Sequence, residues 1–293
     1  MAETMVRVGD AELCTESFGD PLAPMVLLIA GGACSMDWWD AGFCRRLADG
    51  GRFVVRYDHR DTGRSTGCPP GAPAYTGSDL TGDAAGLIEA LGDGGRAHVV
   101  GLSMGGGIAQ HLAAEHAARV ATLTLMSTSP AFPLVHEARL PPMADRLRAV
   151  FDAPAAEPDW SDGDAVVDYV AEQERPYAGP DFFDETWVRA VARRAVGRTA
   201  NPEAAMKNHW ILAEGEDGAT HRLDEVTAPV LVVHGSEDPL FPPGHAHALV
   251  REIPGAQLLM LEGFGHQAPP PAVWDLLVPA LLRHTAPDPA LRS

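Results

Sequence analysis

One short segment places a serine where it could act as a nucleophile. Gly101-Leu102-Ser103-Met104-Gly105 directly follows the apolar run His98-Val99-Val100 and opens a stretch of helical periodicity. A G-x-S-x-G segment between a strand and a helix is typical of a nucleophile elbow, a strained turn that exposes the serine hydroxyl at the carboxyl edge of a sheet. Its glycines leave room for the turn, and we expect Gly106 and Gly107 to extend the close packing. The alternatives are a glycine-rich surface loop or a phosphate-binding loop, but the Gly-Lys-Ser/Thr ending of the latter is absent.

A serine hydroxyl needs a base and an acid, and both follow later in the chain. In this kind of site the order is serine, then Asp or Glu, then histidine. Asp238 follows the apolar run Val230 to His234, and His266 lies in a glycine-flanked loop after the run Gln257 to Leu261. We therefore predict that Ser103, Asp238 and His266 are the catalytic residues. Glu237 is the alternative acid, and His234 is the alternative histidine.

Ester chemistry also needs hydrogen-bond donors for a negatively charged oxygen. Such donors are commonly the backbone N–H after the nucleophile and one N–H from a loop after an early strand. Here these are Met104 and Gly32, which lies in Ile29-Ala30-Gly31-Gly32-Ala33-Cys34. The sequence predicts that Gly32 and Met104 form an oxyanion hole, although Gly-Gly alone would be only a turn.

Several other residues lie near these segments. We expect Trp38, Phe132 and Trp210 to line a substrate pocket, although large apolar side chains are more often ordinary core. The charged segment Arg56 to Ser65 follows a strand and could suggest a metal or phosphate site. We interpret it instead as a hydrogen-bonded loop that braces the oxyanion side.

The residues that could do chemistry follow short apolar runs, which are typical of buried strands. Gly9-Asp10 is a hairpin signal, so we expect the two strands on either side of it to be antiparallel. The eight predicted strands are Val6 to Val8, Glu12 to Phe18, Met25 to Ala30, Phe53 to Asp58, His98 to Leu102, Thr122 to Met126, Val230 to His234 and Gln257 to Leu261.

Helical periodicity between these strands indicates an α/β fold with a mostly parallel, covered sheet. The predicted crossover helices are Asp79 to Leu91, Met104 to His116, His245 to Ile253 and Val273 to His284. One insertion, residues 131–225, lacks strand runs, and we interpret it as a helical cap. The predicted core domain is then residues 1–130 with 226–293.

Composition narrows the classes of partner. The chain has 293 residues and a formal net charge of −18, which would repel nucleic acid and anionic membranes. The four cysteines lack the spacing of a zinc site, and we expect them to be reduced thiols. We therefore expect no cofactor or metal, no nucleic-acid or membrane partner, and a cytoplasmic location.

These motifs together resemble the α/β-hydrolase superfamily across essentially the whole chain. Leu47-Ala48-Asp49-Gly50-Gly51, the segment Arg56 to Ser65 and the segment Ala97 to Gly105 are similar to the aclacinomycin methylesterase group of actinobacterial carboxylesterases. That resemblance implies the α/β-hydrolase fold, the hydrolysis of a methyl ester on an aromatic polyketide, and the same five site residues. The chain departs from many relatives in carrying Ala30-Gly31 where they have His-Gly. Its cap is not recognisably that of the methylesterases.

The sequence thus predicts a cofactor-free serine hydrolase that cleaves a small-molecule carboxylic ester through an acyl-enzyme. Because fold and catalytic residues do not fix the acceptor, acyl transfer, lactone opening and C–C bond hydrolysis are alternatives. A hydrolase-fold binding protein without activity is the alternative from outside the enzymes.

Overall fold

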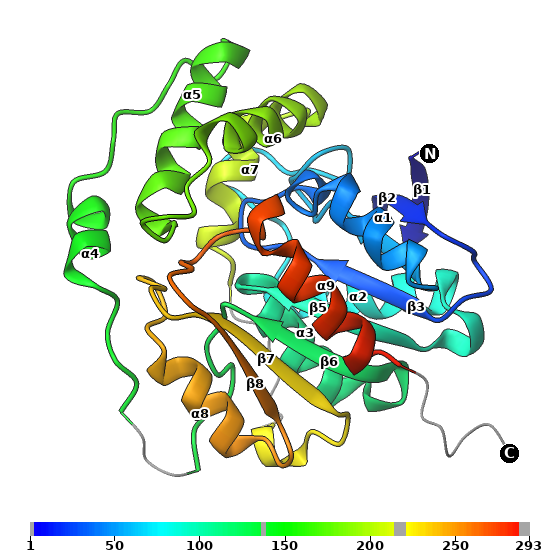
Figure 1. The fold of residues 1–293 in the computed structure, drawn as a ribbon. Coiled ribbons are helices and arrows are strands. Elements are labelled where there is room, and N and C mark those ends of the chain that lie inside the picture. Colours follow the sequence, from blue (N-terminus) through cyan, green and yellow to red (C-terminus); the bar gives the residue numbers. More distant parts are fainter. Residues whose placement is uncertain (1–2, 136–138, 214–220, 287–293) are drawn as a thin grey trace, which may run out of the picture.

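An eight-stranded sheet forms the centre of the protein (Figure 1). The computed structural model describes residues 3–135, 139–213 and 221–286. The strands are β1 (Thr4–Val8), β2 (Ala11–Phe18), β3 (Met25–Ile29), β4 (Phe53–Tyr57), β5 (Ala97–Leu102), β6 (Val120–Met126), β7 (Val230–Gly235) and β8 (Gln257–Leu261). Their spatial order is β1-β2-β4-β3-β5-β6-β7-β8. The β1–β2 and β2–β4 pairs are antiparallel and the others are parallel, so the predicted mostly parallel sheet is confirmed.

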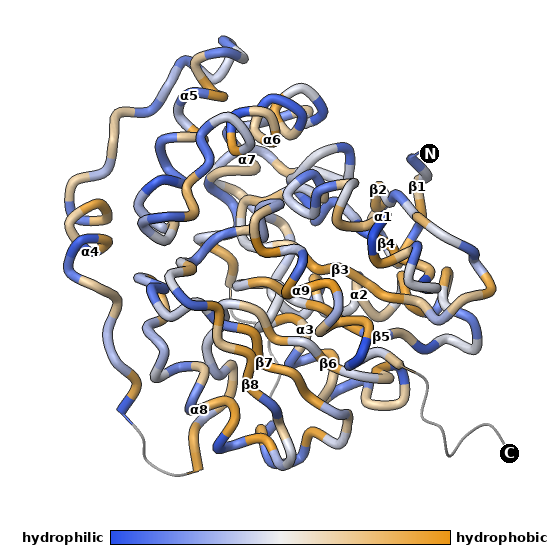
Figure 2. The backbone as a smooth tube through the Cα atoms, in the orientation of Figure 1, coloured by the Kyte–Doolittle hydropathy of each residue, from blue (hydrophilic) through white to orange (hydrophobic). Residues whose placement is uncertain are grey.

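Burial follows the position of each strand in the sheet. Every residue of β3, β4, β5 and β7 is buried, because helices cover both faces of the central strands. Most residues of the edge strands β1 and β8 are exposed or half-buried. The tube coloured by hydropathy in Figure 2 is accordingly most apolar along the central strands.

Two helical layers cover the sheet. Apolar side chains of α2 (Gly77–Leu91), α3 (Met104–Glu115) and α8 (Gly244–Glu252) pack in one core cluster. Those of α1 (Ala41–Asp49) and α9 (Trp274–His284) pack in a second cluster on the other face. The four predicted crossover helices correspond to α2, α3, α8 and α9 within two residues at each end.

Helix α1 is an element that the sequence analysis did not predict. The Asp40 carboxylate caps it by accepting a hydrogen bond from the Gly42 N–H at 2.7 Å. Phe43, Cys44 and Leu47 form its buried side.

The chain between β6 and β7 is helical and contains no named strand among its described residues. It holds α4 (Asp145–Asp152), α5 (Gly163–Glu174), α6 (Glu185–Arg198) and α7 (Pro202–Lys207). Figure 1 shows α5, α6 and α7 gathered beyond one end of the sheet, with α4 to their side. Arg198, the last residue of α6, pairs with Asp37 and Asp58 at 2.6 Å each, which ties this segment to the sheet.

Candidate active site

Ser103 lies at the tight junction between β5 and α3. Its backbone has φ 54° and ψ −116°, a conformation that is strained for a residue with a side chain. A Cβ on Gly101 would lie 2.2 Å from the Gly105 carbonyl oxygen, and one on Gly105 would lie 2.4 Å from the Ile29 carbonyl oxygen. Only glycine fits at these two positions, so the motif folds into the sharp turn that the sequence predicts.

The packing expected for the two following glycines is confirmed at one of them. A Cβ on Gly106 would lie 2.6 Å from the Thr128 side chain. Gly107 has open space at this position, with nothing within 4 Å, so the expectation of close packing there is wrong. Gly107 lies one residue further along α3, where the helix surface has turned away from β6.

The structure brings the hydroxyl of Ser103, the imidazole of His266 and the carboxylate of Asp238 into one hydrogen-bonded chain. Ser103 Oγ lies 2.9 Å from His266 Nε2, and His266 Nδ1 lies 2.8 Å from Asp238 Oδ2. A carboxylate can only accept, so the imidazole proton belongs on Nδ1 and Nε2 is free to accept from the serine. This is the arrangement in which a histidine can withdraw a proton from a serine.

Asp238 is held as a charged group although it is buried. Burial opposes its ionisation, but the His266 ring, the His234 ring 3.5 Å away and the Phe241 N–H together outweigh that effect and lower the pKa of Asp238. The alternative residues are placed differently. Glu237 has an exposed side chain, and His234 Nε2 faces the Phe241 carbonyl oxygen at 2.7 Å.

The loop after β3 lies beside the serine. A Cβ on Gly31 would lie 3.6 Å from Ser103 Cβ, and one on Gly32 would lie 3.7 Å from Met104 Sδ. Gly32 and Met104 are therefore neighbours. The Met104 N–H is the first of α3 and has no intrahelical acceptor, so it is available to an oxygen placed near the serine.

The charged segment after β4 holds this loop. His59 Nε2 lies 3.1 Å from the Ala30 carbonyl oxygen, and Asp58 Oδ1 accepts from the Met36 N–H at 2.9 Å. Burial lowers the pKa of His59 to about 3, so its ring is neutral at ordinary pH. These contacts agree with the interpretation of the segment as a brace. Among the described residues, no group of three or more His, Cys, Asp or Glu side chains could hold a metal ion.

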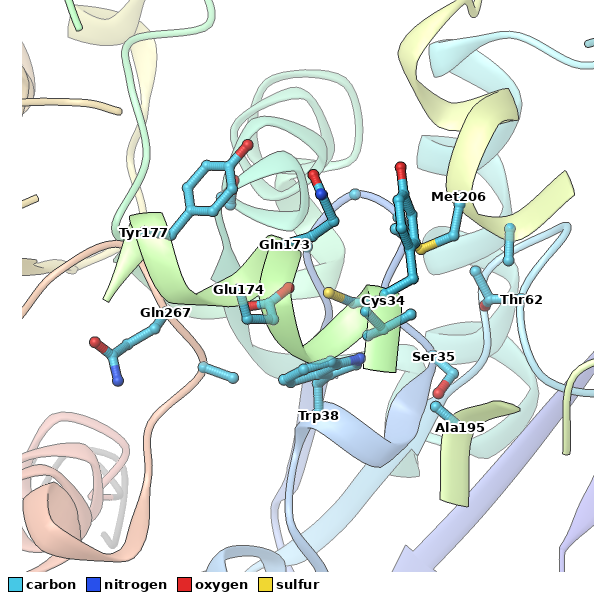
Figure 3. Close-up of a pocket in the computed structure, with 18 of the residues that line it drawn as sticks. Cys34, Ser35, Trp38, Thr62, Gln173, Glu174, Tyr177, Ala195, Met206 and Gln267 are labelled. Atoms are coloured by element: carbon cyan, nitrogen blue, oxygen red, sulfur yellow. The ribbon is translucent and has the colours of Figure 1, made fainter. Parts of the chain in front are cut away.

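A cavity of about 330 Å³ opens above Ser103 and His266. Helices α5, α6 and α7 contribute apolar side chains to its walls, among them Val166, Val196 and Met206, so the segment between β6 and β7 forms part of this pocket. Figure 3 shows this pocket, with Trp38 on one side and Met206 on another.

The three predicted pocket residues have different outcomes. Trp38 is buried and lines the cavity, and Trp210 lines it as well, with its ring 3.5 Å from the position of a Cβ on Gly32. Phe132 does not line it, and that prediction needs correction. Its ring packs on His111 at 4.7 Å and His221 at 5.7 Å, because the chain after β6 turns it toward α3.

The cavity also contains residues that the sequence analysis did not single out. They include Cys34, Tyr169, Gln173, Glu174 and Tyr177. Cys34 lies in the predicted oxyanion loop, so its place could have been anticipated. The other four lie on or just after α5, and no sequence signal shows how α5 packs over the sheet.

Two further expectations can be compared with the structure. All four cysteines are free, as expected. Within the described ranges, no helix is long and apolar enough to cross a membrane.

Residues 24–269, which are most of the chain, match the family model described as the alpha/beta hydrolase fold. The chain belongs to the α/β hydrolase fold family. The predicted fold class is confirmed by this match together with the sheet topology.

Two curated relatives of this α/β hydrolase are similar over almost its full length. Rhodomycin D methylesterase DnrP of Streptomyces peucetius is 34% identical over 298 residues, which cover 97% of this chain and 98% of the relative. Rhodomycin D methylesterase DauP of Streptomyces sp. (strain C5) is 33% identical, with the same coverage. The predicted resemblance to a methylesterase group is confirmed.

A solved structure shows the same fold. The enol-lactonase from Burkholderia xenovorans LB400 superposes with a TM-score of 0.70 at 26% identity, over 96% of this chain and 99% of that chain.

Proposed function

We propose that this α/β hydrolase cleaves carboxylic esters with Ser103 as nucleophile, His266 as general base and acid, and Asp238 as the acid that orients His266. One observation carries the proposal: His266 lies within hydrogen-bond distance of both partners, 2.9 Å from Ser103 Oγ and 2.8 Å from Asp238 Oδ2. The two methylesterase relatives support ester cleavage as the reaction.

The first half of the reaction forms an acyl-enzyme. His266 Nε2 takes the proton of Ser103 while the serine oxygen attacks the ester carbonyl carbon. The carbonyl oxygen becomes negative and accepts hydrogen bonds from the N–H groups of Gly32 and Met104. His266 then gives its proton to the departing alkoxide, so an alcohol leaves and the acyl group stays on Ser103.

The second half repeats these steps with water. His266 removes a proton from a water molecule, the hydroxide attacks the acyl carbon, and the serine oxygen leaves with the proton from His266. The products are a carboxylic acid and an alcohol. Asp238, kept ionised by its contacts, stabilises the charged imidazole in both halves.

We further propose a methyl ester of an aromatic polyketide as the substrate and residues 131–225 as a cap that shapes its pocket. The relatives are named for a methylesterase reaction on rhodomycin D. The cavity volume and the rings of Trp38, Tyr169 and Tyr177 suit an apolar, aromatic acyl group.

The test is turnover of methyl esters of aromatic acids, followed as release of methanol and of the free acid. Wild-type protein should release both in equal amounts, and added alcohols should not divert the acyl group. Ser103→Ala should lower turnover by about 10⁴–10⁶. The matched control is Ser161→Ala, since Ser161 is exposed and hydrogen-bonds to Asp159 on the surface, and this variant should keep wild-type turnover. Folded wild-type protein without turnover on any ester would contradict the proposal.

A further inference from the structure

Glu174 places a carboxyl group inside the cavity that holds Ser103 and His266. It is the last residue of α5, and its side chain belongs to the lining of this cavity. Figure 3 shows it in the middle of the pocket, with Cys34, Trp38 and Gln173 around it. A carboxyl group here is placed to contact a substrate bound in the cavity.

This carboxyl group has no protein partner among the described residues: neither an ion pair nor a hydrogen bond to its side chain occurs there. The nearest cation in sequence, Arg175, is used elsewhere. It pairs with Glu172 at 3.1 Å and Glu185 at 3.0 Å, and its guanidinium lies over the ring of Phe183.

The position is unfavourable for a charge. Burial raises the pKa of Glu174 to about 7, and nearby His266 offsets only part of that effect. The carboxyl group also lies at the negative end of the α5 dipole, which disfavours an anion. A half-buried carboxyl group that lines a cavity and lacks a protein partner is a candidate for contact with a ligand.

The proposed reaction does not need Glu174. His266 already has Asp238 on Nδ1 and Ser103 on Nε2, so neither ring nitrogen is left for a second carboxyl group. Cys34 cannot serve as a counterion, since a thiol never carries a positive charge; burial and the nearby Glu174 raise its pKa and keep it neutral. A bound substrate can therefore supply the partner that the described side chains do not.

We propose that Glu174 binds a hydroxyl group on the acyl part of the substrate ester and so selects hydroxylated aromatic esters. This inference rests on the proposed ester hydrolysis. The donor belongs to the acyl part because a methyl ester has no donor on its alcohol part. A hydroxyl group fits better than an ammonium group, because the apolar walls make the desolvation of a full charge costly. A carboxyl group accepts from a hydroxyl in either protonation state.

The test compares matched pairs of esters. The probes are methyl 5-, 6- and 7-hydroxy-2-naphthoate and their methoxy counterparts, which vary the place of the donor at nearly constant shape. Wild-type protein should prefer the hydroxy ester over its methoxy partner about tenfold in kcat/KM for at least one isomer. A methyl 2-naphthoate series with aminomethyl groups is the comparison for a charged donor. A larger preference for that series would overturn the choice of a hydroxyl group.

Variants then assign the preference to one side chain. Glu174→Leu should bring the hydroxy-to-methoxy ratio close to one, and Glu174→Gln, which keeps an acceptor oxygen and the shape, should retain part of it. The matched control is Glu172→Gln on the exposed side of the same helix, which should keep the wild-type ratio. A ratio that is near one in wild-type protein, or that persists in both Glu174 variants, would overturn the inference.

The two proposals fail in different ways. If wild-type protein cleaves none of the esters, the proposed function is contradicted. If it cleaves hydroxy and methoxy esters equally well through Ser103, the proposed function survives and only the role of Glu174 is rejected.

Discussion

The imidazole of His209 accepts a hydrogen bond from the backbone N–H of Ala33 on Nδ1, at 2.9 Å. Its Nε2 donates to the carbonyl oxygen of Arg60, also at 2.9 Å. Burial lowers the pKa of His209, which keeps the ring neutral and able to accept. His209, which lies between β6 and β7, thus holds the loop that contains Gly32. It does so at Ala33, whose backbone φ of 62° is itself strained.

His209→Phe should therefore impair catalysis through the oxyanion loop. Without its acceptor, the Ala33 N–H is left unpaired and Gly32 is less well fixed. We expect kcat for a methyl ester to fall about tenfold, with KM changed by less than about threefold, because the loss falls on the transition state. His209→Asn, which can offer an oxygen near the position of Nδ1, should recover part of kcat. A rise in KM alone would argue that His209 only shapes the pocket.

Asp238→Asn should lower kcat by about 10³–10⁴. An amide can present an N–H to His266 Nδ1 and so favour the wrong tautomer, which leaves Nε2 unable to accept from Ser103. The neighbouring Glu237→Gln is the control, and its kcat should stay within about twofold because the side chain is exposed. Equal losses in the two variants would contradict the assignment of the acid.

Alanine substitutions at two glycines of α3 should change the free energy of unfolding in opposite directions. Gly105→Ala places a Cβ 2.4 Å from the Ile29 carbonyl oxygen, and we expect a loss of about 1–3 kcal/mol in unfolding free energy. Gly107→Ala meets nothing within 4 Å in a helix interior and should gain about 0.5–1 kcal/mol. Urea unfolding measures both. Stabilisation by Gly105→Ala would show that the turn is not tight.

Buried histidines should make the fold less stable in mild acid. Burial lowers the pKa of His98 to about 4, so below pH 6.5 the unfolded chain takes up a proton there that the folded chain does not. Stability from this group is therefore complete above pH 6.5 and is lost as the pH falls. The free energy of unfolding should fall in both proteins when the pH is lowered from 7.5 to 5.5. The fall should be about 1 kcal/mol smaller in His98→Gln than in wild-type protein.

Glu174 should have the opposite effect to His98 on the pH dependence of the unfolding free energy. Its pKa is raised to about 7, so the folded chain takes up a proton between pH 7.5 and 5.5 before the unfolded chain does. Glu174→Gln should thus lose more unfolding free energy over this range than wild-type protein. An equal loss in the two proteins would mean that the carboxyl group stays ionised in the folded state over this range.

The sheet and the catalytic cluster could be predicted because they depend on local patterns. Apolar runs mark the strands, and the carboxyl ends of parallel strands share one edge, so residues after β5, β7 and β8 had to meet there. Helix α1 was missed because it is short and its apolar residues are interrupted by Arg45 and Arg46. An Asp40 cap and the spacing of Phe43 and Leu47 were the signals available.

The pocket could not be predicted in the same way. The direction in which Phe132 points, and the presence of Glu174 among apolar side chains, depend on how the chain between β6 and β7 packs over the sheet. That packing joins residues far apart in sequence through side-chain contacts that no period in the sequence encodes.

The most direct test of the central claim is covalent labelling of the native protein with a fluorophosphonate, located by peptide mass spectrometry. We expect one label per chain, on Ser103, which is absent in Ser103→Ala and formed far more slowly in His266→Ala. Folded wild-type protein that takes up no label, or takes it up at another serine, would contradict it.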